Sequence, residues 1–223
     1  MIFQDRIRRY SKLRFVIFYP LVGYLVFFSA PDDRFLLPAV LFLAFGVLLR
    51  LWSNGYAIKM GKLTTSGPYA FIRNPLYLGT MSIALGIVVL LREYWLGVLF
   101  AVVMGVVYRR TILQEEKMLE KKFGASYRDY KQSVPGLWPG LNPYLKGDKW
   151  PFSWQRLWES REHKIALWVI ITVIAFELKK ALFVEKEPFD ARSAWLTAAV
   201  VFLAAADVLL EFIKGRFAKK AVA

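Results

Sequence analysis

The stretch "GPYAFIRNPLYLGT", residues 67–80, decides the fold because it separates two strongly apolar runs of the chain. The run before it covers residues 35–53, and the run after it covers residues 81–91. At membrane depth, the backbone groups of a polar turn must be satisfied by protein, water or ligand. The stretch carries two prolines, two glycines, an arginine and an asparagine. We therefore expect a rigid, hydrogen-bonded turn between membrane helices.

The two prolines of this stretch set its shape. Gly67-Pro68 and Asn74-Pro75 each impose a bend, since the residue before a proline is pushed out of the helical region. A new helix is expected to begin near Pro75, because proline suits a first helical position. The free amides of that helix start, together with the Arg73 guanidinium, would suit a carboxylate. A plain membrane-interface turn anchored by Tyr and Arg side chains is an equal alternative at this point.

Composition places the chain among polytopic membrane proteins. Of its 223 residues, 57% are hydrophobic and 17% aromatic, and the mean hydropathy is +0.38, which is too apolar for a soluble domain. The net charge is +14, but the basic residues collect at the ends of apolar runs, so nucleic acid is not an expected partner. The absence of cysteine excludes disulfides and thiolate chemistry. The single histidine, His163, lies in a polar run as a solvated loop residue would, and no metal site is expected.

The apolar runs predict an all-α fold with about six transmembrane helices, a cytosolic cofactor pocket and a short helical hairpin. The candidate spans are residues 14–30, 35–53, 77–91, 95–113, 165–183 and 194–213. The hairpin is expected where only "REYW" separates the third span from the fourth. Lys and Arg gather on alternate loops, which places both termini in the cytosol. The first run lacks a convincing cleavage site and is interpreted as a retained helix.

Two regions are expected along the chain. Residues 1–146 would form the membrane core, and residues 147–223 would supply an interfacial segment and the two C-terminal spans. A cytosolic helix is predicted over 109–133, with a break at Phe123-Gly124 and a restart at Ser126 in a capping box with Asp129. Four prolines and four tryptophans between residues 134 and 160 are typical of the lipid headgroup layer.

An acidic doublet, Glu115 and Glu116, follows the fourth span in "EEKMLEKKFGASYRDY" (115–130). Surface acids on helices commonly have a basic residue three or four positions away, but neither glutamate has one. Glu116 and Glu120 should even repel each other, by about 0.2–0.5 kcal/mol. Such a doublet predicts a cation from elsewhere. Arg73 is the structural option, and a ligand ammonium or ribose hydroxyls are the functional one.

Ionisable residues also occur inside the C-terminal spans. Asp207 and Glu211 lie four residues apart on one helical face, and Glu177 lies near Lys180. Charged residues within a span are costly and are functional candidates by default. A helix–helix polar contact and a substrate contact are both compatible with this pattern.

The turn and the doublet together resemble the isoprenylcysteine carboxyl methyltransferase and phospholipid methyltransferase superfamily of integral membrane enzymes. "GPYAFIRNPLYLG" and "EEKMLEKKFGASYRDYKQSVPGLWP" carry the resemblance, within residues 55–139. It implies S-adenosylmethionine (S-adenosyl-L-methionine) bound on the cytosolic side and a lipophilic acceptor that enters from the bilayer. By motif position, the implied cofactor-binding residues are Tyr69, Arg73, Pro75, Tyr77, Gly79, Glu115 and Glu116. The implied catalytic residues are Arg73, Asn74 and Glu116.

One departure from the family pattern concerns Asn74. The isoprenylcysteine enzymes typically have histidine there, and asparagine cannot titrate, so any proton-handling role of that histidine is absent. The resemblance still predicts a methyltransferase that acts on a lipid or lipophilic acceptor, with membrane lipids as partners. A bacterial inner membrane is the expected location, and the endoplasmic reticulum is the alternative. Two alternatives are a sterol-reductase-like enzyme that uses NADPH and a non-enzymatic membrane scaffold of the same fold.

Overall fold

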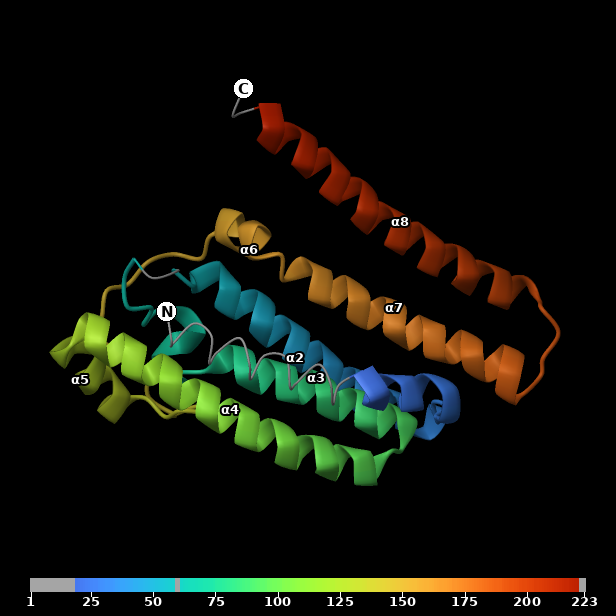
Figure 1. The fold of residues 1–223 in the computed structure, drawn as a ribbon, viewed down its shortest axis with the longest axis horizontal. Coiled ribbons are helices and arrows are strands. Elements are labelled where there is room, and N and C mark those ends of the chain that lie inside the picture. The colour runs from blue at the N-terminus through green and yellow to red at the C-terminus, as the bar shows by residue number, and fades with distance from the viewer. Residues whose placement is uncertain (1–18, 59–60, 221–223) are drawn as a thin grey trace. The chain divides into compact units, whose positions relative to one another are not determined.

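The protein is all-helical over the residues that the structure, a computed structural model, describes: 19–58 and 61–220, with side chains described to residue 212. Within these ranges the elements are helices and short helical turns, and no strand is present (Figure 1). The predicted all-α class is confirmed. The basic N-terminal segment and the start of the first expected span lie outside the described residues.

The chain forms two compact units, residues up to Glu162 and residues from His163 onward. The expected division fell after residue 146. The first unit contains a helix at Tyr19–Phe28, α2 (Leu36–Tyr56), α3 (Pro75–Leu91), α4 (Tyr94–Phe123), α5 (Ala125–Ser133) and α6 (Trp154–Ser160). The second contains α7 (His163–Lys179), a π-helical turn at Lys180–Val184 and α8 (Ala191–Lys220).

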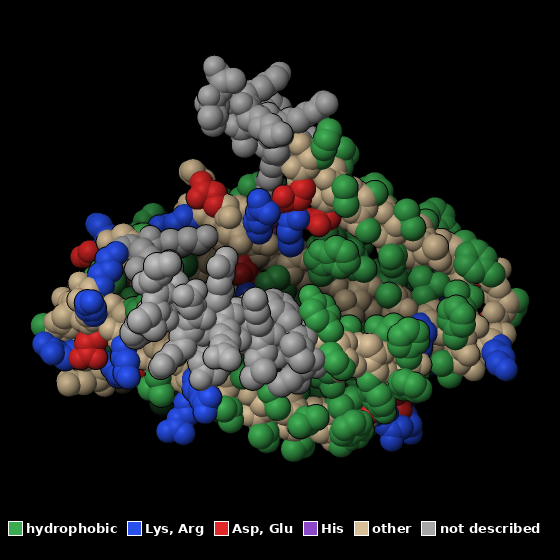
Figure 2. Space-filling model, viewed as in Figure 1, with side chains coloured by type: hydrophobic (Ala, Val, Ile, Leu, Met, Phe, Trp, Pro, Cys, Tyr) green, Lys and Arg blue, Asp and Glu red, His purple; other side chains and the backbone are tan. Residues whose placement is uncertain are grey.

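Judged by length and composition, fewer helices in the described part of the chain can span a membrane than the six that the sequence predicted. Asp33–Tyr56, Tyr94–Phe123 and Ala191–Phe212 are long and apolar enough to cross a membrane, among the described residues. Helix α3 has 17 residues, and at about 1.5 Å per residue it falls short of a hydrocarbon core of roughly 30 Å. The predicted count of six is therefore not confirmed. Apolar side chains cover much of the visible helix surface (Figure 2), as an integral membrane protein requires.

Close packing of α2 against α3 positions the predicted turn. A Cβ added at Gly79 would lie 2.6 Å from Arg50 Cγ and 2.9 Å from the carbonyl oxygen of Gly46, so the two helices can approach this closely only because residue 79 is a glycine. Helix α3 begins at Pro75, as predicted. It ends at Leu91, and the φ of 57° at the next residue, Arg92, reverses the chain into α4 and forms the predicted helical hairpin.

The junction between α4 and α5 lies at Gly124. Its φ of 55° and ψ of −123° end α4 after Phe123, and α5 begins at Ala125 without a side-chain cap. The predicted break is confirmed, but the predicted capping box is wrong. Ser126 lies inside α5, and the Asp129 carboxylate instead binds Tyr144 and Lys146.

The segment before α6 packs onto the end of α2. The Trp150 indole N–H donates to the Tyr56 carbonyl at 3.0 Å, and the Arg156 Nε–H donates to the Gly55 carbonyl at 3.1 Å. Trp154, at the start of α6, leaves 77% of its surface exposed. The location of this segment in the lipid headgroup layer stays a prediction, but its hydrogen bonds attach it to the end of α2.

The second unit carries the acids that the sequence singled out. Lys164 Nζ on α7 lies 3.1 Å from an Asp207 carboxylate oxygen and 3.2 Å from one of Glu211, both on α8. Of the two alternatives for these acids, the helix–helix polar contact is therefore present. In a bilayer such a contact ties two helices together.

Candidate functional site

The backbone of the predicted turn is satisfied by protein. The Arg73 amide donates to the Pro135 carbonyl at 2.9 Å, and the Asn74 amide donates to the Gly136 carbonyl at 3.2 Å. The Asn74 side chain repeats this contact, since its Nδ2 donates to the same Gly136 oxygen at 3.0 Å. The residue in the family's histidine position therefore helps to hold the turn against the segment after α5.

Further contacts continue this attachment along the turn. The amides of Gly140 and Tyr144 donate to the carbonyls of Phe71 and Ala70, at 2.8 and 2.9 Å, and the Tyr130 hydroxyl donates to the Tyr69 carbonyl at 2.7 Å. We call residues 135–144 the clamp. The sequence predicted a turn that needs partners, but nothing in it identified the clamp as their source.

Arg73 and the acidic doublet meet, as predicted. Arg73 Nη1 lies 2.7 Å from Glu116 Oε1, and Lys131 Nζ on α5 lies 2.8 Å from Glu116 Oε2. The side chains of Arg73 and Glu116 are only 15% and 8% exposed. Lys131 was missed because the break at Gly124 removes α5 from the helical register of Glu116.

One nitrogen of this cluster has no partner. Arg73 Nε is buried and is without a hydrogen bond to any described residue, although the Tyr127 hydroxyl interacts with the same side chain. An unsatisfied buried donor costs about 1–3 kcal/mol, so this nitrogen is a group to which a ligand acceptor would bind favourably.

Glu115 lies beside the ion-pair cluster but has a different environment. One of its oxygens accepts a hydrogen bond from the Tyr77 hydroxyl at 3.0 Å. The Tyr77 ring lies 4.7 Å from the Tyr108 ring, centroid to centroid. Glu116 is neutralised by two cations, whereas Glu115 accepts its hydrogen bond from a neutral hydroxyl, so the two acids of the doublet are not equivalent.

A cavity of about 190 Å³ brings most of the predicted residues together. Its walls include Tyr69, Arg73, Asn74, Glu115 and Glu116. Pro75, Tyr77 and Gly79 are not among its described lining residues. Pro75 begins α3, Gly79 allows α2 to approach, and Tyr77 is connected to the cavity through Glu115.

Buried tyrosines make up another part of the cavity wall. Burial, with the negative charge of Glu116 nearby, raises the pKa of Tyr127 to about 12. Burial likewise raises the pKa values of Tyr69 and Tyr130 well above their usual range. All three hydroxyls therefore stay protonated at neutral pH, so they can donate hydrogen bonds but cannot act as bases.

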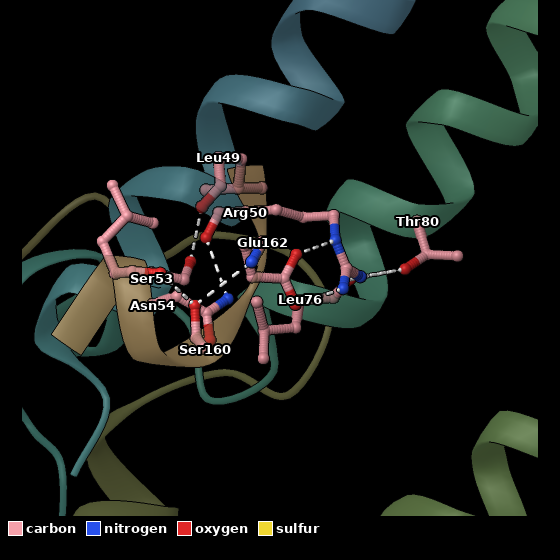
Figure 3. Close-up of polar contacts among 9 residues, drawn as sticks. Leu49, Arg50, Ser53, Asn54, Leu76, Thr80, Ser160 and Glu162 are labelled. Atoms are coloured by element: carbon pink, nitrogen blue, oxygen red, sulfur yellow. Dashed lines mark hydrogen bonds and ion pairs between the residues drawn. The ribbon is translucent and has the colours of Figure 1, made fainter. Parts of the chain in front are cut away.

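A second buried ion pair holds the start of α3, the helix that follows the turn. The Arg50 guanidinium on α2 binds Glu162 through two parallel contacts of 2.9 and 2.8 Å. Its Nη1 donates to the Leu76 carbonyl at 3.0 Å and also contacts the Thr80 hydroxyl. Figure 3 shows the guanidinium between Glu162 and the first turns of α3. Arg50 was visible in the sequence as a lone charge in an apolar run, but its partner lies 112 positions away.

Residues 36–126 match the phospholipid methyltransferase family. The resemblance that the two motifs predicted is confirmed for this region, which contains the turn, the hairpin and the acidic doublet.

Relatives of two kinds match the chain. The protein-S-isoprenylcysteine O-methyltransferase of Schizosaccharomyces pombe is 38% identical over 73 residues, 33% of this chain and 31% of the relative. The Mus musculus protein of the same name is 39% identical over 87 residues, 39% of this chain and 29% of the relative. The match thus spans under a third of those relatives. The cobalt-zinc-cadmium resistance protein CzcN of Cupriavidus metallidurans is 28% identical over 149 residues, 64% of this chain and 68% of the relative. No solved structure matches the chain.

Proposed function

We propose that this protein is an integral membrane methyltransferase that uses S-adenosylmethionine to methylate a lipid or another lipophilic acceptor by in-line transfer. The family match of residues 36–126 supports the reaction class. The apolar helices support an acceptor that arrives through the bilayer. Both termini would lie in the cytosol, and the membrane would be the inner membrane of a bacterium.

The observation that carries this proposal is the buried, unpartnered Arg73 Nε beside a cavity. The cavity combines cations with carboxylates, which suits an amino-acid zwitterion such as the methionine part of the donor. Arg73 would hold the donor's carboxylate through its guanidinium. Glu115 would hold the ammonium, since Glu116 is already occupied by Arg73 and Lys131.

S-adenosylmethionine supplies a methyl group that its sulfonium already activates. The residues of the cavity therefore contribute mainly alignment, an effect that can be worth about 7–11 kcal/mol. A carboxylate acceptor needs no base. An acceptor that must lose a proton would find Glu115 the better base, because Glu116 is ion-paired twice and the tyrosines stay protonated.

Equilibrium binding of S-adenosylhomocysteine to the detergent-purified protein tests the proposal. Arg73→Ala is expected to weaken binding about 10- to 100-fold, as the loss of a charged hydrogen bond implies. Arg73→Lys keeps the charge but loses the bidentate geometry of the guanidinium, so its affinity is expected to lie between those of the wild type and Arg73→Ala. Arg109→Ala, which removes an exposed arginine of α4, is the matched control. A preference for NADPH would indicate a reductase. If neither ligand binds, the non-enzymatic membrane scaffold is the remaining hypothesis.

Two further experiments address the acceptor and the orientation. Incubation with a radiolabelled methyl donor and a total lipid extract would show which lipid class takes the label. Because the sequence has no cysteine, single cysteines introduced at the two ends can be labelled from either side of the membrane. Labelling of both ends from the cytosolic side is the expected result.

A further inference from the structure

A second cavity adjoins the Arg73 cavity. Its volume is about 450 Å³, compared with about 190 Å³ for the first. The two cavities share the wall residues Lys62, Leu63 and Phe123. Sites for drug-sized ligands usually measure roughly 300–1,000 Å³. The Arg73 cavity alone is therefore too small for a molecule that joins an amino acid to a nucleoside, whereas the two together are large enough.

Asp129 lies in the wall of the second cavity, and two neighbouring side chains fix its carboxylate. One of its carboxylate oxygens accepts from the Tyr144 hydroxyl at 2.8 Å, and the other lies 3.3 Å from Lys146 Nζ. These two contacts lower the pKa of Asp129, so the side chain stays ionised. A carboxylate has about four acceptor sites, which leaves two for a ligand. The side chain is 42% exposed, so those sites are accessible.

The remaining wall matches the rest of a nucleoside. Leu63 and Phe123, which are shared with the Arg73 cavity, offer apolar and aromatic surface. Aromatic rings stack with nucleobases. A carboxylate that accepts hydrogen bonds from ribose hydroxyls is also a recurring way to recognise nucleosides. The apolar surface is next to the first cavity, and the carboxylate belongs to the second.

We propose that the second cavity binds the nucleoside half of the methyl donor, with Asp129 accepting hydrogen bonds from the ribose hydroxyls. The amino-acid half then occupies the Arg73 cavity. This inference rests on the proposed function. It adds Asp129 to the binding residues, which the motif positions did not assign.

The test compares S-adenosylhomocysteine with its 2′,3′-dideoxyribose analogue by titration calorimetry. The wild-type protein is expected to bind the analogue about 10- to 100-fold more weakly, because the charged hydrogen bonds are lost. Asp129→Ala should bind both ligands with nearly equal affinity. Asp129→Asn, which keeps an acceptor for Tyr144, should give an intermediate ratio. The control is Asp33→Ala. Asp33 lies shortly before the first residue of α2, so this variant should keep the wild-type ratio.

Several outcomes overturn the inference. One is an affinity ratio of the two ligands that Asp129→Ala leaves unchanged; if both affinities fall equally, the role of Asp129 is structural. A photoreactive 8-azidoadenosyl donor provides a measurement on the unaltered protein. It should label peptides that contain residues 61–65 or 123–148, and labelling elsewhere alone would refute the assignment. If S-adenosylhomocysteine binds in an Arg73-dependent way without this discrimination, only the nucleoside site fails. If it does not bind at all, the proposed function fails as well.

Discussion

The buried pair between Arg50 and Glu162 makes a quantitative prediction for the stability of the first unit. Glu162→Gln keeps the shape of the side chain but removes its charge. Arg50 would then remain as an uncompensated cation in a site where its side chain is only 15% exposed. Its contact with the Leu76 carbonyl would persist, but a carbonyl does not neutralise a charge.

The expected magnitude follows from this burial. Removing one partner of a buried ion pair costs about 3–5 kcal/mol, and the remaining exposure of both side chains favours the lower end. For a chain of this size each kcal/mol shifts the melting temperature by roughly 2–4 °C, so a loss of roughly 6–12 °C is expected. The double variant Arg50→Met/Glu162→Met should recover most of this loss, because apolar replacement of a whole buried pair is often neutral.

Thermal unfolding in detergent, followed by circular dichroism, measures these differences. Arg34→Met is the matched control, because Arg34 pairs with Asp32 but is 75% exposed. That change should cost at most about 1 kcal/mol. The reasoning is refuted if Glu162→Gln is as mild as the control, or if the double variant is no more stable than Glu162→Gln.

Three more predictions follow from the packing around the site. Gly79→Ala places a Cβ 2.9 Å from the Gly46 carbonyl oxygen and should cost about 1–3 kcal/mol in stability; an unchanged melting temperature would contradict this. Tyr130→Phe removes the hydroxyl that binds the Tyr69 carbonyl, and a loss of about 1 kcal/mol is expected in the same assay. The pKa of Tyr127 is raised from 10.0 to about 12, so folding favours its neutral form. Its stabilising effect is complete below pH 10 and is lost as the pH rises towards 12, a decline that Tyr127→Phe should reduce.

Motif spacing predicted much of the site. The two X-Pro dipeptides gave a turn and a helix that begins at Pro75. The missing helical partners of the acidic doublet indicated an outside cation, and Arg73 is that cation for Glu116. Both predictions depend on local rules, namely proline geometry and helical spacing, which can be applied within a short window of sequence.

Contacts between distant segments were not predictable in this way. The clamp binds the turn through backbone groups, which every residue has, so residue identity carries no signal for it. Glu162 lies in a polar run in which several charges could have paired with Arg50. Ser126 and Asp129 have the spacing of a capping box, but the left-handed Gly124 starts α5 one residue before Ser126. Tertiary contacts decided the first two of these, and the backbone conformation of Gly124 decided the third.

The clamp also has a practical consequence for anyone who shortens this chain. The family match ends at residue 126, yet the turn depends on carbonyls and amides at 135–144, and Arg50 depends on Glu162. A fragment trimmed to the matched borders would retain the turn and the acidic doublet and still leave the ligand-facing arginine without its scaffold. The smallest piece worth expressing therefore extends through Glu162.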